Sequence, residues 1–256
     1  MRTRRARESA WTSRAAEVTV ARSVIRIAVL ALAFVLSARL AAAATISWMV
    51  DGVERFAIIY APKSLPAGKL PLIFSFHGHG DDMENFQYVG LQSAWPDAIV
   101  VYFQGLPSRD GYSGWQVEPG EYGDRDLKMV DVALAALKKK YNVDDNRIYA
   151  TGFSNGAHFT YLLWAARPDV FAAFAPVAGR IRPTAMPKVP KPILIIGGER
   201  DQQVAFQDQR AAIGIATRVN GAAAPVMTWI HPGGHEYPRP TSGKIAEFFH
   251  EHVRGD

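Results

Sequence analysis

The chain has 256 residues, of which 48% are hydrophobic, and it contains no cysteine. This length and composition suit one large domain with a sizeable core, and they exclude disulfides, thiolate metal sites and a cysteine nucleophile. The formal net charge is +5, but residues 1–44 hold eight arginines and two glutamates, so the remaining chain carries 21 basic and 22 acidic residues. Because this main part of the chain is not basic, we expect no nucleic-acid partner.

The first 44 residues have the pattern of an export signal. Arginines precede the apolar stretch VIRIAVLALAFVL at residues 24–36, and four alanines follow at residues 41–44. A basic segment, a short apolar segment and a site of small residues are typical of a secretory signal peptide. We therefore expect residues 1–44 to be cleaved off and the mature protein to be secreted or periplasmic, without membrane attachment. An uncleaved anchor is the alternative, although the uninterrupted apolar run Ile27–Leu36 has only ten residues and is short for a bilayer span.

The segments after the signal predict strands. Thr45–Val50 and Val53–Tyr60 flank Asp51-Gly52, which is a strong signal for a two-residue hairpin turn. Leu70–Phe76 and Ala98–Phe103 are nearly continuous apolar runs, as expected for strands that are buried on both faces of a sheet.

Helix and strand signals alternate in the second half of the chain. Apolar residues recur with helical spacing in Leu127–Tyr141, which ends in three lysines. The elements that follow are strand Arg147–Gly152, helix Asn155–Ala166, strands Val170–Ala178 and Ile193–Gly197, a helix near Gln207–Val219, strand Pro225–His231 and helix Lys244–Val253. This alternation predicts a single α/β domain over residues 45–256, with a mostly parallel central sheet of about eight strands and helices on both faces. Active sites in such sheets lie at the carboxyl ends of the strands.

One strand-to-helix junction carries the sequence Gly152-Phe153-Ser154-Asn155-Gly156. A Gly-x-Ser-x-Gly motif between a strand and a helix forms a sharp turn that presents the serine hydroxyl above the sheet. We predict Ser154 as a nucleophile. The alternative is a serine that only caps the N-terminus of the helix.

A serine nucleophile needs a base, and the base needs a carboxylate that orients it. Asp201 follows the strand PILIIGG and His235 follows the strand VMTWIH, so both are expected at the same edge of the sheet as Ser154. The order serine, acid, histidine along the chain is that of α/β-hydrolases. Glu199 is the alternative acid. His231 is the alternative base, but it ends an apolar strand, where a buried structural histidine is more common.

The turn His77-Gly78-His79-Gly80 follows the strand Leu70–Phe76. In α/β-hydrolases a turn in this position donates one backbone N–H to the oxyanion hole, and the residue after the nucleophile donates the other. We predict the N–H groups of His79 and Asn155 for these roles. The run from His77 to Asp82 also nearly matches the zinc-binding pattern His-x-His-x-Asp-His, but it ends in aspartate and lacks a suitable set of later histidines. We therefore expect neither a metal nor a cofactor.

The segment Gln104–Gly123 has no clear helix or strand pattern. It contains five glycines together with Tyr112, Trp115 and Tyr122, and unstructured segments of this length are usually functional or disordered. Trp115 is predicted to bind substrate as a stacking wall, with anchoring of the loop in the core as an equal alternative. Three aspartates near the next helix are expected to include an N-cap and solvated positions: Asp124, Asp126 and Asp131.

Taken together, the motifs resemble the polyhydroxybutyrate-depolymerase-like esterases, which include feruloyl and acetylxylan esterases. The similarity rests on HGHGDD, YNVDDNRIYATGFSNGAHF, FAAFAPVAG, PILIIGGERD and GGH within residues 50–250. It implies an α/β-hydrolase fold, cleavage of carboxylic esters, and catalysis by Ser154, Asp201 and His235. Many secreted relatives carry a cysteine where this chain has His79.

The expected function is that of a secreted serine carboxylic-ester hydrolase that acts through an acyl-enzyme. Its expected partner is a small-molecule or polymeric ester: a short-chain, hydroxyalkanoate or aromatic feruloyl-type ester. Two alternatives stay open. One is a serine peptidase on the same fold, and the other is a non-catalytic ligand-binding protein on a hydrolase scaffold.

Overall fold

The computed structural model describes residues 42–62 and 68–255. The predicted signal peptide lies outside this part of the chain, apart from residues 42–44, which begin the first strand. Within the described residues, no helix combines the length and the apolar character that a membrane crossing requires.

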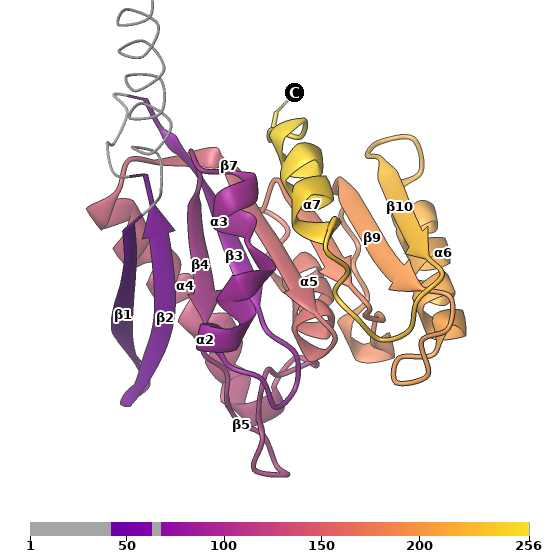
Figure 1. The fold of residues 1–256 in the computed structure, drawn as a ribbon, viewed down its shortest axis with the longest axis horizontal. Helices are drawn as coiled ribbons and strands as arrows, with labels where there is room; N and C mark the ends of the chain where they lie inside the picture. Colours follow the sequence, from indigo (N-terminus) through magenta and orange to yellow (C-terminus); the bar gives the residue numbers. More distant parts are fainter. Residues whose placement is uncertain (1–41, 63–67, 256) are drawn as a thin grey trace, which may run out of the picture. The chain divides into compact units, whose positions relative to one another are not determined.

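A central sheet of eight strands forms the core of the fold, in the order β1-β2-β4-β3-β7-β8-β9-β10 (Figure 1). The strands are β1 (Ala42–Val50), β2 (Val53–Ala61), β3 (Leu70–Phe76), β4 (Ile99–Phe103), β7 (Val143–Phe153), β8 (Ala173–Val177), β9 (Ile193–Gly198) and β10 (Val226–His231). β2 pairs antiparallel with β1 and with β4, and all other neighbours are parallel. The predicted, mostly parallel sheet of about eight strands is confirmed.

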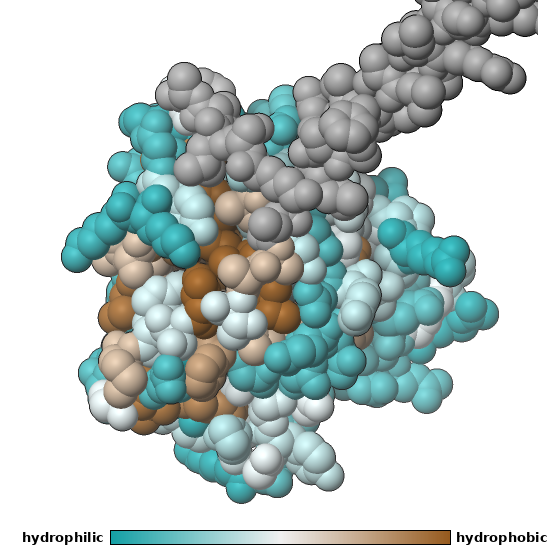
Figure 2. Space-filling view, turned by 60° about the vertical axis from the view of Figure 1, so that its left-hand side comes forward, coloured by the Kyte–Doolittle hydropathy of each residue, from teal (hydrophilic) through white to brown (hydrophobic). Residues whose placement is uncertain are grey.

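The β1–β2 hairpin turns at Asp51-Gly52, as predicted. Both residues have positive φ, 48° and 80°, which is the conformation that a two-residue hairpin turn requires and that glycine adopts without strain. β1 is one of the two edge strands of the sheet, and apolar residues gather on the side of the molecule that Figure 2 brings forward. Met49, Val53 and Phe56 of the hairpin are among the exposed apolar residues.

Helices cover both faces of the sheet, as predicted (Figure 1). Side chains of α4 (Arg125–Lys140), α5 (Asn155–Ala166) and α6 (Phe206–Asn220) belong to one buried apolar cluster. Side chains of α2 (Met83–Phe86), α3 (Leu91–Ala94) and α7 (Thr241–His250) belong to a second cluster on the other face. Helices α2 and α3, with the 3-10 turn η1 (Gln87–Val89) between them, were not predicted, because helices of four residues are too short to show a helical period.

The segment Gln104–Gly123 is ordered. It contains a two-stranded ribbon of β5 (Leu106–Pro107) and β6 (Ser113–Gly114), and it leads into the 3-10 turn η2 (Glu121–Asp124). Short strands of this kind carry no detectable sequence period, so the pattern alone could not find them.

Strand order determines where the site forms. β7 lies between β3 and β8, and β9 lies between β8 and β10. The carboxyl ends of these parallel strands therefore meet at one edge of the sheet. That edge carries the turn that begins at His77, then Ser154, and further along Asp201 and His235.

Candidate active site

Ser154 lies in a sharp turn between β7 and α5. Its φ of 55° and ψ of −114° are strained for a residue with a side chain, as is typical of a nucleophile elbow. Its hydroxyl makes no cap hydrogen bond with the helix, so the helix-cap alternative is not supported. A Cβ atom at Gly152 would clash with the carbonyl of Gly156, and one at Gly156 would clash with the carbonyl of Phe76. The tight turn therefore requires glycine at both positions.

The structure brings Ser154, His235 and Asp201 together in one hydrogen-bonded chain. Nε2 of His235 lies 2.8 Å from Oγ of Ser154, and Nδ1 of His235 lies 2.8 Å from Oδ2 of Asp201. A carboxylate can only accept, so Nδ1–H donates to Asp201, and in the neutral ring Nε2 is left to accept the serine proton. The ring of Phe153 packs on the imidazole at 4.9 Å between centroids.

The Asp201 carboxylate is buried, with a side-chain exposure of 0%, and is fully hydrogen-bonded. Oδ1 accepts the N–H groups of Gln203 and Val204, each at 2.9 Å. Oδ2 accepts Nε2–H of Gln209 at 2.9 Å in addition to the His235 contact. Sequence reasoning missed Gln209. Its only signal is its place on the buried side of α6, three residues before Ala212 and seven before Ala216.

The alternative acid, Glu199, and the alternative base, His231, take no part in the hydrogen bonds that join Ser154, His235 and Asp201. Glu199 is exposed, and its backbone N–H donates to the carbonyl of His231. His231 is buried, and its Nδ1 accepts the N–H of Gly233 at 3.1 Å. The hydrogen bonds of the described residues join Ser154 to His235 and Asp201, and not to either rival.

The turn after β3 lies beside the nucleophile. A Cβ atom at Gly78 would be 3.7 Å from Cβ of Ser154. Within this turn His77 is fully buried, and burial lowers its pKa. Its Nδ1–H donates to the carbonyl of Gly78 at 2.7 Å, and its Nε2 accepts the N–H of Gly105 at 2.9 Å. The neutral ring of His77 therefore ties the turn to the loop at residue 105.

The two histidines of the near-zinc pattern face different partners. Both ring nitrogens of His77 are engaged with backbone groups, while Nε2 of the half-exposed His79 lies 2.8 Å from Asp110. Across residues 42–62 and 68–255, no group of three or more histidine, cysteine, aspartate or glutamate side chains is placed to hold a metal ion.

Trp115 is only 2% exposed, and its contacts favour the core anchor over the stacking wall. The indole N–H donates to the carbonyl of His77 at 2.9 Å. The ring stacks on Phe159 at 13° and meets Phe76 edge-on. No open aromatic face of Trp115 is left for a substrate.

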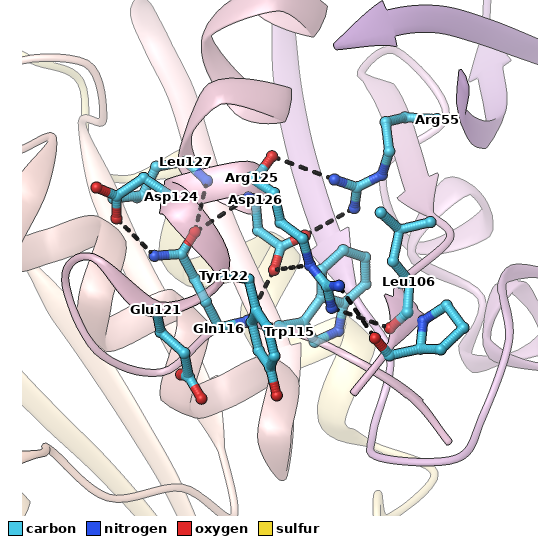
Figure 3. Close-up of polar contacts among 12 residues, drawn as sticks. Arg55, Leu106, Trp115, Gln116, Glu121, Tyr122, Asp124, Arg125, Asp126 and Leu127 are labelled. Atoms are coloured by element: carbon cyan, nitrogen blue, oxygen red, sulfur yellow. Dashed lines mark hydrogen bonds and ion pairs between the residues drawn. The ribbon is translucent and has the colours of Figure 1, made fainter. Parts of the chain in front are cut away.

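The three aspartates near α4 differ from one another. Asp131 is solvated, as expected, and pairs with Arg167. Asp124 precedes α4, but its side chain makes no cap hydrogen bond. The expectation of solvated or capping positions is wrong for Asp126, which has an exposure of 0% and forms an ion pair with Arg55 at 2.7 Å (Figure 3). Its partner is 71 residues away in the sequence, so no local pattern could have indicated it.

His158 is a buried titratable group next to the nucleophile. It lies one turn after Ser154 on α5, and its Nε2 is buried without a hydrogen-bond partner among the described residues. Burial, together with the positive charges of Arg182 and Arg180, lowers the pKa of His158 to about 3. This histidine is therefore neutral in the folded protein near pH 7.

A pH-dependent loss of stability follows from His158. The unfolded chain takes up a proton near the ordinary histidine pKa of about 6.5, whereas the folded chain does so only near 3. Stability is therefore lost as the pH falls from about 6.5 towards 3, by up to about 1.4 kcal/mol per pH unit. We expect His158→Met to show a shallower decline in the free energy of unfolding between pH 7 and pH 4.5, measured by urea denaturation. His250→Met, at an exposed position of α7, serves as the control with the wild-type slope. An unchanged slope in His158→Met would contradict the prediction.

Known proteins resemble this chain over part of its length. Residues 117–245 match the model of the dienelactone hydrolase family. The chain belongs to this family. It is 32% identical over 161 residues to a bifunctional acetylxylan esterase/xylanase of Neocallimastix patriciarum, covering 61% of this chain and 23% of that protein. It is 27% identical over 225 residues to a probable feruloyl esterase C of Aspergillus terreus, covering 73% of this chain and 80% of that protein.

Other relatives and solved structures extend the comparison. A poly(3-hydroxyalkanoate) depolymerase C of Paucimonas lemoignei is 29% identical, covering 47% of this chain and 30% of that protein. A thermostable esterase structure has a TM-score of 0.65 at 20% identity and covers 83% of this chain and 63% of the other. A ferulic acid esterase from Anaeromyces mucronatus has a TM-score of 0.62 at 16% identity and covers 83% of this chain and 91% of the other.

These comparisons confirm the α/β-hydrolase fold of this dienelactone hydrolase family member. They also confirm the resemblance to feruloyl esterases and polyhydroxyalkanoate depolymerases that the sequence motifs indicated. The matched part of the chain spans less than half of the first two curated relatives, 23% and 49% of their lengths.

Proposed function

We propose that the protein is a serine carboxylic-ester hydrolase. The observation that carries this proposal is the chain of two 2.8 Å contacts from Ser154 through His235 to Asp201, built on a strained strand-to-helix turn. Esterase names among the relatives support the same reaction class.

In the proposed reaction, Oγ of Ser154 attacks the ester carbonyl and passes its proton to Nε2 of His235. The backbone N–H groups of His79 and Asn155 stabilise the negative charge that develops on the carbonyl oxygen. His235 then gives its proton to the departing alkoxide, which leaves an acyl-enzyme on Ser154. A water molecule, deprotonated by His235, attacks the acyl carbonyl; the bond to Oγ of Ser154 then breaks, and His235 returns the proton to Oγ, which releases the acid and restores the serine. Asp201 keeps the imidazole in the tautomer that these steps require.

For the substrate, we propose short-chain, hydroxyalkanoate or aromatic feruloyl-type esters. The support is the feruloyl esterase and the poly(3-hydroxyalkanoate) depolymerase among the relatives. Export through an N-terminal signal peptide at residues 1–44 is likewise a proposal, supported by the basic and apolar pattern of that segment.

The experiment that tests the function combines turnover with labelling. The purified protein is assayed with p-nitrophenyl acetate and butyrate, methyl ferulate, a 3-hydroxybutyrate trimer and aminoacyl p-nitroanilides. A fluorophosphonate is applied in parallel, and the modified peptide is identified by mass spectrometry. We expect ester turnover and one label on Ser154. Turnover of the anilides alone would indicate a peptidase, and the absence of both turnover and label would indicate a binding protein.

A further inference from the structure

A buried ion pair joins β2 to α4. Arg55 of β2 and Asp126 of α4 are 1% and 0% exposed. Nη2 of Arg55 donates to Oδ1 of Asp126 at 2.7 Å, and Nη1 donates to the carbonyl of Arg125 at 3.2 Å. Buried ion pairs are costly to desolvate and are weak evidence of stabilisation by themselves. The contacts of this pair therefore point to a positional role.

The second oxygen of Asp126 holds the loop that contains Trp115. Oδ2 accepts the N–H of Gln116 at 2.7 Å, while Oε1 of Gln116 accepts the N–H groups of Asp126 and Leu127 at 3.0 and 3.2 Å (Figure 3). Gln116 has an exposure of 0%. These reciprocal bonds join the loop to the first turn of α4, and any shift of Asp126 must move Gln116 with it.

Trp115, which precedes Gln116, hydrogen-bonds to the side chain of Asn155 and to the turn that contains His79. Its backbone N–H donates to Oδ1 of Asn155 at 2.7 Å, and its carbonyl accepts Nδ2–H of Asn155 at 3.2 Å. Its indole N–H donates to the carbonyl of His77, two residues before His79. The loop packs tightly against both residues at Gly114, because a Cβ atom there would lie 2.9 Å from Oδ1 of Asn155 and 3.2 Å from Nδ1 of His79.

We infer that Arg55 and Asp126 are positioning residues that set the two oxyanion donors, His79 N–H and Asn155 N–H, through the Trp115–Gln116 segment. This inference rests on the proposed function. Oxyanion donors act only when they are aimed at the developing charge, and loss of one donor costs about 10²- to 10³-fold in kcat. A small displacement of both donors is therefore expected to lower kcat without weakening the binding of the ground state.

Asp126→Asn tests the inference with an almost isosteric change. One carboxylate oxygen becomes an NH₂ group, which must face either Nη2 of Arg55 or the N–H of Gln116, and both are donors. We expect kcat to fall about 10- to 100-fold, with KM unchanged, below the cost of deleting a donor outright. Fluorophosphonate titration gives the concentration of intact sites, so that partial unfolding is not counted as slow turnover.

A transition-state analogue separates positioning from general stability. A trifluoromethyl ketone adds to Ser154 as a hemiketal whose oxyanion occupies the hole, whereas the product acid binds as a ground-state ligand. In Asp126→Asn we expect the Ki of the ketone to rise by the same factor as kcat/KM falls, and the Ki of the acid to stay at the wild-type value. The matched control is Asp131→Asn on the same helix, because it removes an exposed aspartate–arginine pair and is expected to change neither constant.

Two further variants keep the inference testable. Arg55→Lys is the substitute if Asp126→Asn does not fold. Lysine retains the charge but cannot make both guanidinium contacts, so the same selective rise in the Ki of the ketone is expected. In the double variant Asp126→Asn/Asn155→Ala, the loss of kcat should be smaller than the product of the two single losses, because both changes act on the shared contact between Trp115 and Asn155. Additive losses, or a folded Asp126→Asn or Arg55→Lys protein with wild-type kcat and ketone affinity, would overturn the inference. A wild-type protein without turnover or label would refute the proposed function, and this inference with it.

Discussion

Ester hydrolysis is expected to disappear in Ser154→Ala, with kcat reduced by at least about 10⁴-fold. The substitution removes only Oγ, the atom that lies 2.8 Å from Nε2 of His235. Alanine keeps the Cβ atom, so the backbone strain at φ 55° is the same as for serine. The variant should therefore fold with a wild-type Tm, and the measurement is kcat for p-nitrophenyl butyrate together with thermal unfolding.

The control for Ser154→Ala is Ser93→Ala, which changes an exposed serine of α3. Turnover and Tm should both remain at wild-type values in this control. Full turnover in folded Ser154→Ala would place the nucleophile elsewhere and would contradict the proposed mechanism.

Asp201→Asn is expected to lower kcat by about 10³- to 10⁴-fold while leaving the backbone in place. The carboxylate accepts four hydrogen bonds, from Gln203, Val204, Gln209 and His235. An asparagine NH₂ group at Oδ2 would donate to Nδ1 of His235 and move the ring proton to Nε2, where it blocks acceptance of the serine proton. An NH₂ group at Oδ1 would instead face two backbone N–H donors. Both orientations impair the site.

The matched control here is Glu199→Gln, which alters the exposed rival acid two residues earlier. Its kcat should equal that of the wild type in the same p-nitrophenyl butyrate assay. The reverse result, a loss in Glu199→Gln and none in Asp201→Asn, would reassign the acid to Glu199.

Several parts of the fold follow from short stretches of sequence. Asp51-Gly52 predicts its hairpin because positive φ at both turn positions is a local requirement that these residues meet. The apolar runs of β3 and β4 predict strands that are buried on both faces of the sheet, and the structure confirms that each of their residues is buried. The helices α4, α5, α6 and α7 were found within a few residues of their bounds, whereas the short elements α2, α3, β5 and β6 lacked enough length for a period.

Some residues of the site could likewise be predicted from the sequence, and others could not. Ser154, Asp201 and His235 each follow a predicted strand, and parallel strands bring their carboxyl ends to one edge, so their meeting could be expected from chain order alone. The role of Trp115 could not be decided, because its partner His77 lies 38 residues away. Gln209 also gave no distinct signal, since its bond to Asp201 depends on how α6 packs against the end of β9.

The sequence by itself therefore indicated the alternation of the longer strands and helices along the chain, the sharp turn at Ser154 and the three residues that meet there. Each of these depends on local conformational preference or on the regular geometry of a parallel sheet. Only the tertiary structure decided that Asp126 is buried against Arg55 and joined through Gln116 and Trp115 to Asn155. Those contacts join residues that lie 10 to 71 positions apart, and their burial is a property of the packed core that no single segment carries.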